Sequence, residues 1–244
     1  MLKNIKYVGH RGSRGVGVEN TIEAFQEGIK RGYFALECDI RVTKDNQFVV
    51  IHDETLERLA PNDPLNSFQI TELTYEQLKQ VTLTQTYQGR ILTGKIPLLK
   101  EYLKLCKQNN IIPVIELKWS TGINDNDNSN VSNLIQLIKD EGMYNNCVIL
   151  TSMKNTIKYI RDHYQDISLQ LLIGGNSKIS DEILKFAVLN RLSVDIEKNV
   201  LTKEIIDFIH ANKLLVNVWV VNEINQAKQF SSWGVDMITT DVLN

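Results

Sequence analysis

Short runs of β-branched residues alternate with longer amphipathic stretches along this chain, and no other feature constrains its fold as strongly. Eight runs are predicted to be strands: 5–9, 34–40, 113–118, 147–151, 168–173, 193–196, 214–220 and 235–239. Seven predicted helices separate them: 21–30, 98–108, 131–141, 155–163, 180–189, 202–211 and 223–232. Such alternation predicts parallel strands joined by helical crossovers. In a chain of 244 residues, eight strands favour a closed (β/α)8 TIM barrel over an open sheet.

One region interrupts this alternation. The segment 53–95, after the second barrel strand, is too long for a simple crossover. Within it, 62–67 is rich in turn residues and 74–80 is typical of a short helix, while 47–52 just before it is typical of an extra strand. We therefore predict a small insertion on a single barrel domain that spans 1–244, and not a second domain.

Charge and cysteine content exclude several classes of protein. The 27 Lys and Arg nearly balance the 29 Asp and Glu, so neither nucleic acid nor an anionic membrane is an expected partner. No apolar stretch reaches transmembrane length, which predicts no stable membrane insertion. The three cysteines have no CxxC spacing and fit a reducing compartment, so we expect a cytoplasmic location. The sequence leaves the oligomeric state open.

Charged residues stand at the carboxyl ends of the predicted strands, where a TIM barrel carries its active site. Because side chains alternate along a strand, Glu37 and Asp39 share one face, as do Glu116 and Lys118. Three converging carboxylates repel one another unless a cation lies between them, and ligation by oxygen alone suits Mg²⁺ or Ca²⁺. The pattern therefore predicts a metal site at Glu37, Asp39 and Glu116. The alternative is a set of structural ion pairs with neighbouring Arg and Lys side chains.

Two cationic side chains and two imidazoles adjoin this predicted metal site. Arg11 and Lys118 match the oxygens of a phosphate, and His10 and His52 could exchange protons near neutral pH. The other two histidines lie in charged helical stretches and are expected at the surface. A metal, two cations and two histidines together indicate phosphoester chemistry.

Seven short motifs, in order, resemble those of the glycerophosphodiester phosphodiesterases. They are HRG at 10–12, ENT at 19–21, ExD at 37–39, HD at 52–53, ExK at 116–118, VWVVN at 218–222 and GVDMITTD at 234–241. The resemblance implies a TIM barrel that hydrolyses glycerophosphodiesters, as small-molecule substrates, to sn-glycerol 3-phosphate and an alcohol, with one Mg²⁺ or Ca²⁺ ion.

The resemblance also implies a role for each site residue. Glu19 and Asn20 would shape the site beneath the metal, and which histidine is the acid and which the base stays open. The implied set is His10 and His52 for acid–base catalysis, Glu37, Asp39 and Glu116 for the metal, Arg11 and Lys118 for phosphate, and Trp219 for the glycerol side.

The chain departs from the family pattern in three places. Val220 replaces the usual Thr, Val242 follows Asp241 where Pro is usual, and 57–61 lacks the usual Gly and Thr. The last change lies in the insertion and puts the preference for a head group in doubt. Two alternatives remain: a lysophospholipase D-like phosphodiesterase, or a barrel that only binds phosphodiesters. Core packing is the alternative role for Trp219.

Overall fold

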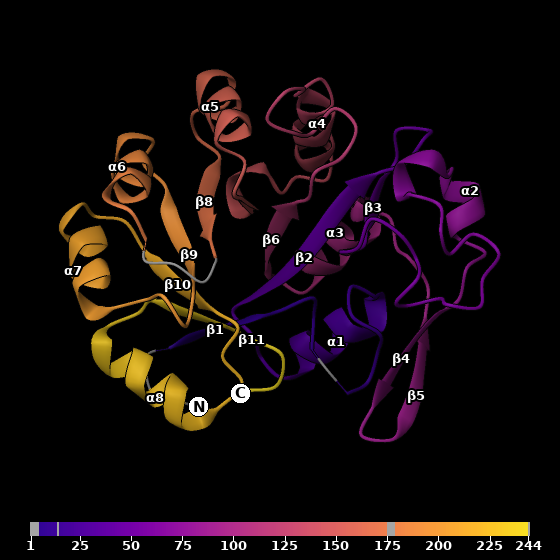
Figure 1. The fold of residues 1–244 in the computed structure, drawn as a ribbon, viewed down its shortest axis with the longest axis horizontal. Coiled ribbons are helices and arrows are strands. Elements are labelled where there is room, and N and C mark those ends of the chain that lie inside the picture. The colour runs from indigo at the N-terminus through magenta and orange to yellow at the C-terminus, as the bar shows by residue number, and fades with distance from the viewer. Residues whose placement is uncertain (1–4, 14, 175–178, 244) are drawn as a thin grey trace.

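The predicted barrel is confirmed in the computed structural model, which describes residues 5–13, 15–174 and 179–243. Eight parallel strands close into a ring because β1 pairs with both β2 and β11 (Figure 1). No strand end differs from its predicted position by more than two residues. The barrel strands are β1 (Lys6–Gly9), β2 (Ala35–Val42), β6 (Ile112–Leu117), β7 (Val148–Thr151), β8 (Ser168–Ile173), β9 (Ser193–Glu197), β10 (Val216–Trp219) and β11 (Met237–Thr240).

Helices cover the outside of this ring (Figure 1). α7 begins after Thr202, whose hydroxyl accepts the backbone N–H of Ile205, and it buries Ile206 and Ile209 against the strands. No helix in the described ranges is long and apolar enough to cross a bilayer. The crossover helices are α1 (Ile22–Lys30), α3 (Leu99–Gln108), α4 (Val131–Asp140), α5 (Lys154–His163), α6 (Asp181–Leu189), α7 (Lys203–Ala211) and α8 (Ile224–Trp233).

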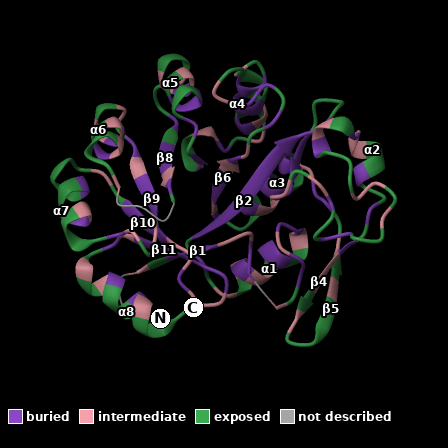
Figure 2. Cartoon of the chain, in the orientation of Figure 1, coloured by how far each residue is buried: buried purple, intermediate pink, exposed green. Residues whose placement is uncertain are grey.

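The two faces of the strands carry different residues. On β2, Leu36, Cys38 and Ile40 are buried in the large apolar cluster between strands and helices, which places Glu37 and Asp39 on the inner face. Figure 2 shows the strands buried and the outer helix surfaces exposed. A smaller apolar cluster fills the barrel interior: Val8, Ala35, Val114, Leu150 and Met237. The alternation thus delivers the charged residues to the inside of the barrel mouth.

The interruption between β2 and α3 folds on the side of the barrel and is joined to its sheet (Figure 1). It begins with β3 (Phe48–Val50), antiparallel to β2, and continues through η1 (Ile70–Glu72) and α2 (Tyr75–Leu78). The extra strand and the short helix are therefore confirmed. The unit packs around its own apolar cluster, which includes Leu56, Leu59, Ile70, Leu78 and Leu83.

A hairpin completes the insertion, and our sequence analysis did not predict it. β4 (Leu83–Tyr87) and β5 (Arg90–Gly94) pair antiparallel through a two-residue loop, Gln88 and Gly89, in which both φ angles are positive. That geometry is typical of a type I′ turn, for which Asn-Gly is the usual signal and Gln-Gly a weaker one. Apart from the buried Leu83, the hairpin side chains are half-buried or exposed, so they lack a strong apolar alternation.

Candidate active site

Three carboxylates meet at the barrel mouth. Glu37 and Asp39 lie on β2 and Glu116 on β6, and the strand register places Asp39 directly opposite Glu116. One oxygen from each carboxylate lies within 4.8 Å of the others. Glu37 is only 3 % exposed and Asp39 is fully buried. The structure therefore brings together the three residues that we predicted as metal ligands.

Both predicted phosphate-binding cations lie against these carboxylates. Lys118 Nζ contacts Glu116 and lies 3.1 Å from Asp39 Oδ1, while Arg11 Nε lies 3.0 Å from Asp39 Oδ2. The backbone N–H of Arg11 donates to Glu37 Oε2 at 2.9 Å. The ion pairs that we considered as an alternative are thus present. They share the cavity with the rest of the site.

The charge around the three carboxylates is unevenly distributed. Burial opposes ionisation of Asp39, but Lys118 and Arg11 outweigh it and lower its pKa. Burial, together with repulsion from neighbouring carboxylates, raises the pKa of Glu37 well above its usual range and that of Glu116 to about 7. Glu37 Oε1 is buried with no hydrogen-bond partner among the described residues. An oxygen cluster with surplus negative charge fits a hard divalent cation.

The loop after β1 sets the position of Arg11. It passes so close to α1 that a Cβ on Gly12 would lie 2.6 Å from the backbone of Ala24, and Gly12 has a φ of +93°. Only glycine fits there without strain. The HRG motif therefore uses its glycine to seat the loop on the helix, and the guanidinium of Arg11 then points at the carboxylates.

Glu19 and Asn20 support the site from the side. Asn20 Nδ2 donates to Asp39 Oδ2 at 2.8 Å, and Asn20 Oδ1 accepts the backbone N–H of Asp39. Glu19 accepts from Arg11 at 2.7 Å and from both terminal nitrogens of Arg58 at 2.7 and 2.9 Å. Since Arg58 belongs to the insertion, Glu19 links the insertion to the barrel mouth.

Each candidate catalytic histidine is held by a carboxylate through Nδ1. His10 Nδ1 lies 2.9 Å from Asp241 Oδ1, and Asn222 Nδ2 donates to the other oxygen of Asp241 at 2.6 Å. His52 Nδ1 lies 2.6 Å from Asp53 Oδ1. Because a carboxylate only accepts, both Nδ1 atoms carry hydrogen, and Nε2 of each ring is left for proton transfer.

The two imidazole–carboxylate pairs differ in their surroundings. The second carboxylate oxygen of Asp53, Oδ2, accepts a hydrogen bond from Arg58 Nε at 2.6 Å. Burial, followed by the charges of Lys118 and Arg11, lowers the pKa of His52, although nearby carboxylates oppose this shift. The imidazole of His52 is thus neutral over a wider pH range than a free histidine.

A cavity of about 110 Å³ connects these groups, with room for several water molecules or a small polar fragment. Asp39 lies behind the cavity lining, in contact with the two cations. The cavity is lined by seven of the eight predicted site residues, namely His10, Arg11, Glu37, His52, Glu116, Lys118 and Trp219, and by Leu150, Leu172, Asp195 and Thr239.

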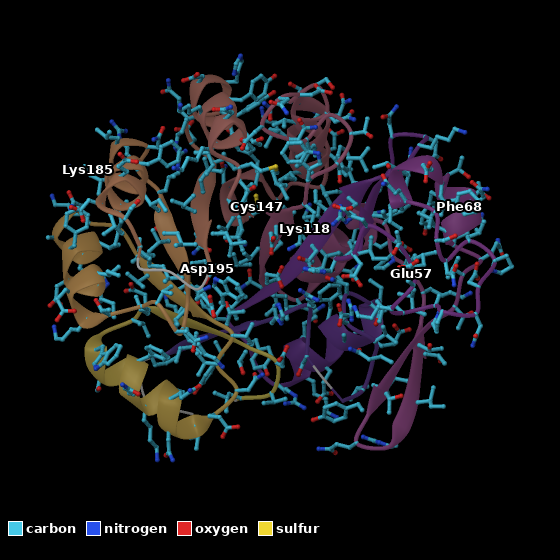
Figure 3. All side chains as sticks on the ribbon, viewed as in Figure 1. Glu57, Phe68, Lys118, Cys147, Lys185 and Asp195 are labelled. Atoms are coloured by element: carbon cyan, nitrogen blue, oxygen red, sulfur yellow. The ribbon has the colours of Figure 1, made fainter. Side chains whose placement is uncertain are left out.

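Asp195, which the motifs in the sequence do not mark, faces this cavity from β9. It is 2 % exposed, its Oδ1 has no hydrogen-bond partner in the described ranges, and burial raises its pKa well above the usual value. Trp219 Nε1 donates to the backbone oxygen of Asp195 at 3.2 Å. Figure 3 labels Asp195 and Lys118, both inside the ring of helices. Strand alternation in 193–197 was the available signal.

Asp241 and Arg58 were also missed as functional residues. Asp241 belongs to a motif that we quoted, but nothing in its spacing predicts contact with His10, which is 231 positions away. Arg58 lies in the stretch that departs from the family pattern, and only the folded insertion brings it to Asp53 and Glu19.

Comparison with known proteins agrees with this geometry. The sequence model of the glycerophosphoryl diester phosphodiesterase family matches residues 10–244. A glycerophosphodiester phosphodiesterase of Bacillus altitudinis is 29 % identical over 238 residues, which cover 97 % of this chain and 94 % of that protein. A phosphodiesterase of Oleispira antarctica, solved with sn-glycerol-3-phosphate, superposes with a TM-score of 0.82 at 19 % identity, covering 97 % of this chain and 92 % of the other.

The fold and the site together define a class of protein, a TIM-barrel phosphodiesterase with its charged groups at the carboxyl ends of the strands. Within that class, the chain belongs to the glycerophosphoryl diester phosphodiesterase family. It is an enzyme of the phosphoric diester hydrolase type.

Proposed function

We propose that this enzyme hydrolyses glycerophosphodiesters to sn-glycerol 3-phosphate and an alcohol, with His10 and His52 as the acid–base pair. The observation that carries the proposal is that both imidazoles, each held through Nδ1, line one cavity with carboxylates and cations. Family membership supports the reaction, and the Oleispira antarctica relative binds the proposed product.

Glu37, Asp39 and Glu116 would hold the divalent ion, Mg²⁺ or Ca²⁺. The unpartnered Glu37 oxygen and the raised pKa of Glu116 support this assignment. When bound, such a cation polarises a phosphoryl oxygen as a Lewis acid. Arg11 and Lys118 would bind the remaining phosphate oxygens and offset the negative charge that develops in the transition state.

The two histidines would divide the proton transfers. One Nε2 accepts a proton from the attacking hydroxyl, either water or a glycerol hydroxyl, as that oxygen bonds to phosphorus. The bond from phosphorus to the leaving oxygen breaks, and the other Nε2 donates a proton to that oxygen. Asp241 and Asp53 hold the rings in the tautomer that both steps need.

The glycerol half would lie against the opposite wall of the cavity. Trp219 offers an apolar ring there, and Asp195 offers a carboxyl group with an unpartnered oxygen. A glycerol hydroxyl would satisfy that oxygen, which otherwise costs free energy as a buried polar atom.

A lysophospholipid is the second candidate substrate. Human lysophospholipase D GDPD1 is 40 % identical over 98 residues, which cover 39 % of this chain and 31 % of that protein. We propose the dissolved glycerophosphodiester first, and a cytoplasmic location, which the three buried free cysteines support. Fractionation that finds the protein outside the cytoplasm would contradict the location.

Release of glycerol 3-phosphate from glycerophosphocholine tests the proposal. We expect product with the untreated enzyme, none with EDTA, and recovery when Mg²⁺ or Ca²⁺ is restored, which also identifies the ion. Lysophosphatidylcholine micelles serve as the comparison substrate. Turnover of the micelles alone would favour the lysophospholipase D reaction, whereas tight binding of glycerophosphocholine without turnover would indicate a binding barrel.

A further inference from the structure

A groove of about 410 Å³ opens beside the active site, between the insertion and the loop that follows β6. Neither the predicted site residues nor the proposed chemistry uses it. We call it the insertion groove. Its lining residues are Arg41 from β2, Glu54, Gln69, Ile70 and Thr71 from the insertion, and Trp119, Ser120, Thr121 and Asn124 from the loop.

Arg41 joins this groove to the catalytic cavity. Its Nε donates to the backbone oxygen of His52, and its Nη1 donates to the backbone oxygen of Trp119, both at 2.8 Å. His52 lines the catalytic cavity, and Trp119 directly follows Lys118, which also lines it. The insertion groove therefore adjoins the part of the catalytic cavity that carries His52 and Lys118, whereas Asp195 lines that cavity from β9.

The charge of the insertion groove is balanced. Arg41 and Glu54 are its only ionisable residues, and their nearest atoms are 3.9 Å apart. Two of the five N–H groups of Arg41 already donate to carbonyl oxygens, and Glu54 offsets the charge of its guanidinium. A head group with a strong charge of either sign would therefore meet one attractive and one repulsive residue here.

Most of the remaining lining side chains are neutral hydrogen-bonding groups, hydroxyls and amides. Ser120 is 3 % exposed, and its hydroxyl has no hydrogen-bond partner in the part of the chain that the structure describes. Trp119 is 52 % exposed, so its large ring is available beside these groups instead of in the core. An aromatic face next to neutral donors and acceptors fits a ligand with an apolar C–H face and several hydroxyls.

We propose that the insertion groove binds the leaving alcohol of the substrate and selects a neutral polyol, such as a glycerol or inositol head group. This inference rests on the proposed function, because it assigns the second half of the same phosphodiester. His52 lies at the junction between cavity and groove, where a proton must reach the departing oxygen.

The test compares three substrates that share the glycerophosphate half: glycerophosphoinositol, glycerophosphoglycerol and glycerophosphocholine. We expect the wild-type enzyme to cleave the two polyol esters with a kcat/KM about 10-fold above that of the choline ester. Trp119→Ala should abolish this preference, mainly by raising KM for the polyol esters, and Trp119→Phe should keep part of it. Ser120→Ala should weaken the preference in the same direction.

Phe68→Ala is the matched control. Phe68 is an aromatic residue of the insertion, 47 % exposed and outside the groove lining, and Figure 3 shows it at the periphery. We expect this variant to retain the wild-type order of substrates. A Trp119→Ala enzyme with an unchanged ratio of kcat/KM values would overturn the inference, as would a wild-type preference for choline.

Calorimetric binding separates this inference from the proposed function. If the wild-type enzyme cleaves none of the three esters, the proposed function fails. Tighter binding of glycerophosphoinositol than of glycerophosphocholine, lost in Trp119→Ala, would still support the groove. Equal binding of the two esters by both proteins would refute it.

Discussion

The two walls of the catalytic cavity differ sharply in chemistry. The wall formed by β1, β2 and β6 carries three carboxylates, two cations and, through Asp39, a web of ion pairs. The wall formed by β7 to β10 carries two leucines, one tryptophan and a single carboxyl group, Asp195. The groups that we propose to react are thus concentrated on one side, and the other side would contact the glycerol half of the substrate. Substitutions on the charged wall should therefore lower kcat, whereas substitutions on the opposite wall should have effects that depend on the substrate.

The largest effect is expected on the charged wall, from loss of an imidazole. His10→Ala or His52→Ala should lower kcat by roughly 10²–10⁴-fold because a positioned proton carrier is removed. His163→Ala is the control, since that histidine lies at the end of α5 and bonds to a backbone oxygen. Steady-state kinetics with glycerophosphocholine, with circular dichroism to confirm folding, checks this expectation. Turnover within a few-fold of wild type would refute the assigned roles.

A smaller loss is expected when His10 keeps its ring and loses its support. Asp241→Asn replaces the carboxylate that accepts from Nδ1, and the misplaced imidazole should cost about 10²-fold in kcat with little change in KM. Asn222→Ala, which removes the donor to the other oxygen of Asp241, should show a weaker effect of the same kind. A change confined to KM would show that Asp241 contacts substrate instead of positioning the histidine.

On the opposite wall, the loss should depend on the substrate. Asp195→Asn should lower kcat/KM about 10-fold for glycerophosphocholine and leave bis(p-nitrophenyl) phosphate, which has no glycerol hydroxyls, almost unaffected. Asp166→Asn, at an exposed position, serves as the control. An equal loss on both substrates would show that Asp195 acts in the reaction itself, as the residues of the charged wall do, and not in binding glycerol.

The smallest expected effect concerns the increase in protein stability that a bound metal ion gives, which should depend on pH. The raised pKa of Glu116, about 7, lies above its unfolded value of about 4.3, so without a cation the folded state favours the protonated form. That stabilisation is complete below pH about 4.3 and is lost as pH rises through about 7. A bound cation removes the repulsion among the ionised carboxylates.

Thermal unfolding with EDTA or Mg²⁺ measures this coupling. The increase in Tm on adding the ion should be larger by a few degrees at about pH 8 than at about pH 5.5. Ca²⁺ gives a parallel series if it is the ion that restores activity. The same increase at both pH values would show that Glu116 titrates outside this range or does not face the ion.

The sequence predicts the charged wall far better than its opposite. Glu37 and Asp39 share a face through simple alternation, and the structure brings both next to Glu116. Asp195 alternates in the same way on β9, with Glu197 two positions further on, but neither residue belongs to a motif that the resemblance marks. Strands and helices follow from local periodicity, whereas the contact of His10 with Asp241 exists only once the barrel closes.

The insertion shows a second limit. Its β3 and α2 are predicted from local patterns, while the hairpin of β4 and β5 is missed because its residues are half-exposed and its turn is Gln-Gly. The place of Trp119 in the insertion groove depends on how 53–95 folds back over the barrel, which no local pattern predicts.

The separate apolar cluster of the insertion has a consequence for how such enzymes diversify. Leu56, Ile70 and Leu78 pack in this cluster and not in the larger cluster between strands and helices, so substitutions there should disturb few contacts of the barrel core. During evolution, the insertion could therefore be replaced by a different segment that confers a new head-group preference, while the barrel keeps its fold. The ion pairs of Arg58 with Glu19 and Asp53 limit such exchanges. A replacement segment would have to supply a cation at the same position, next to Glu19.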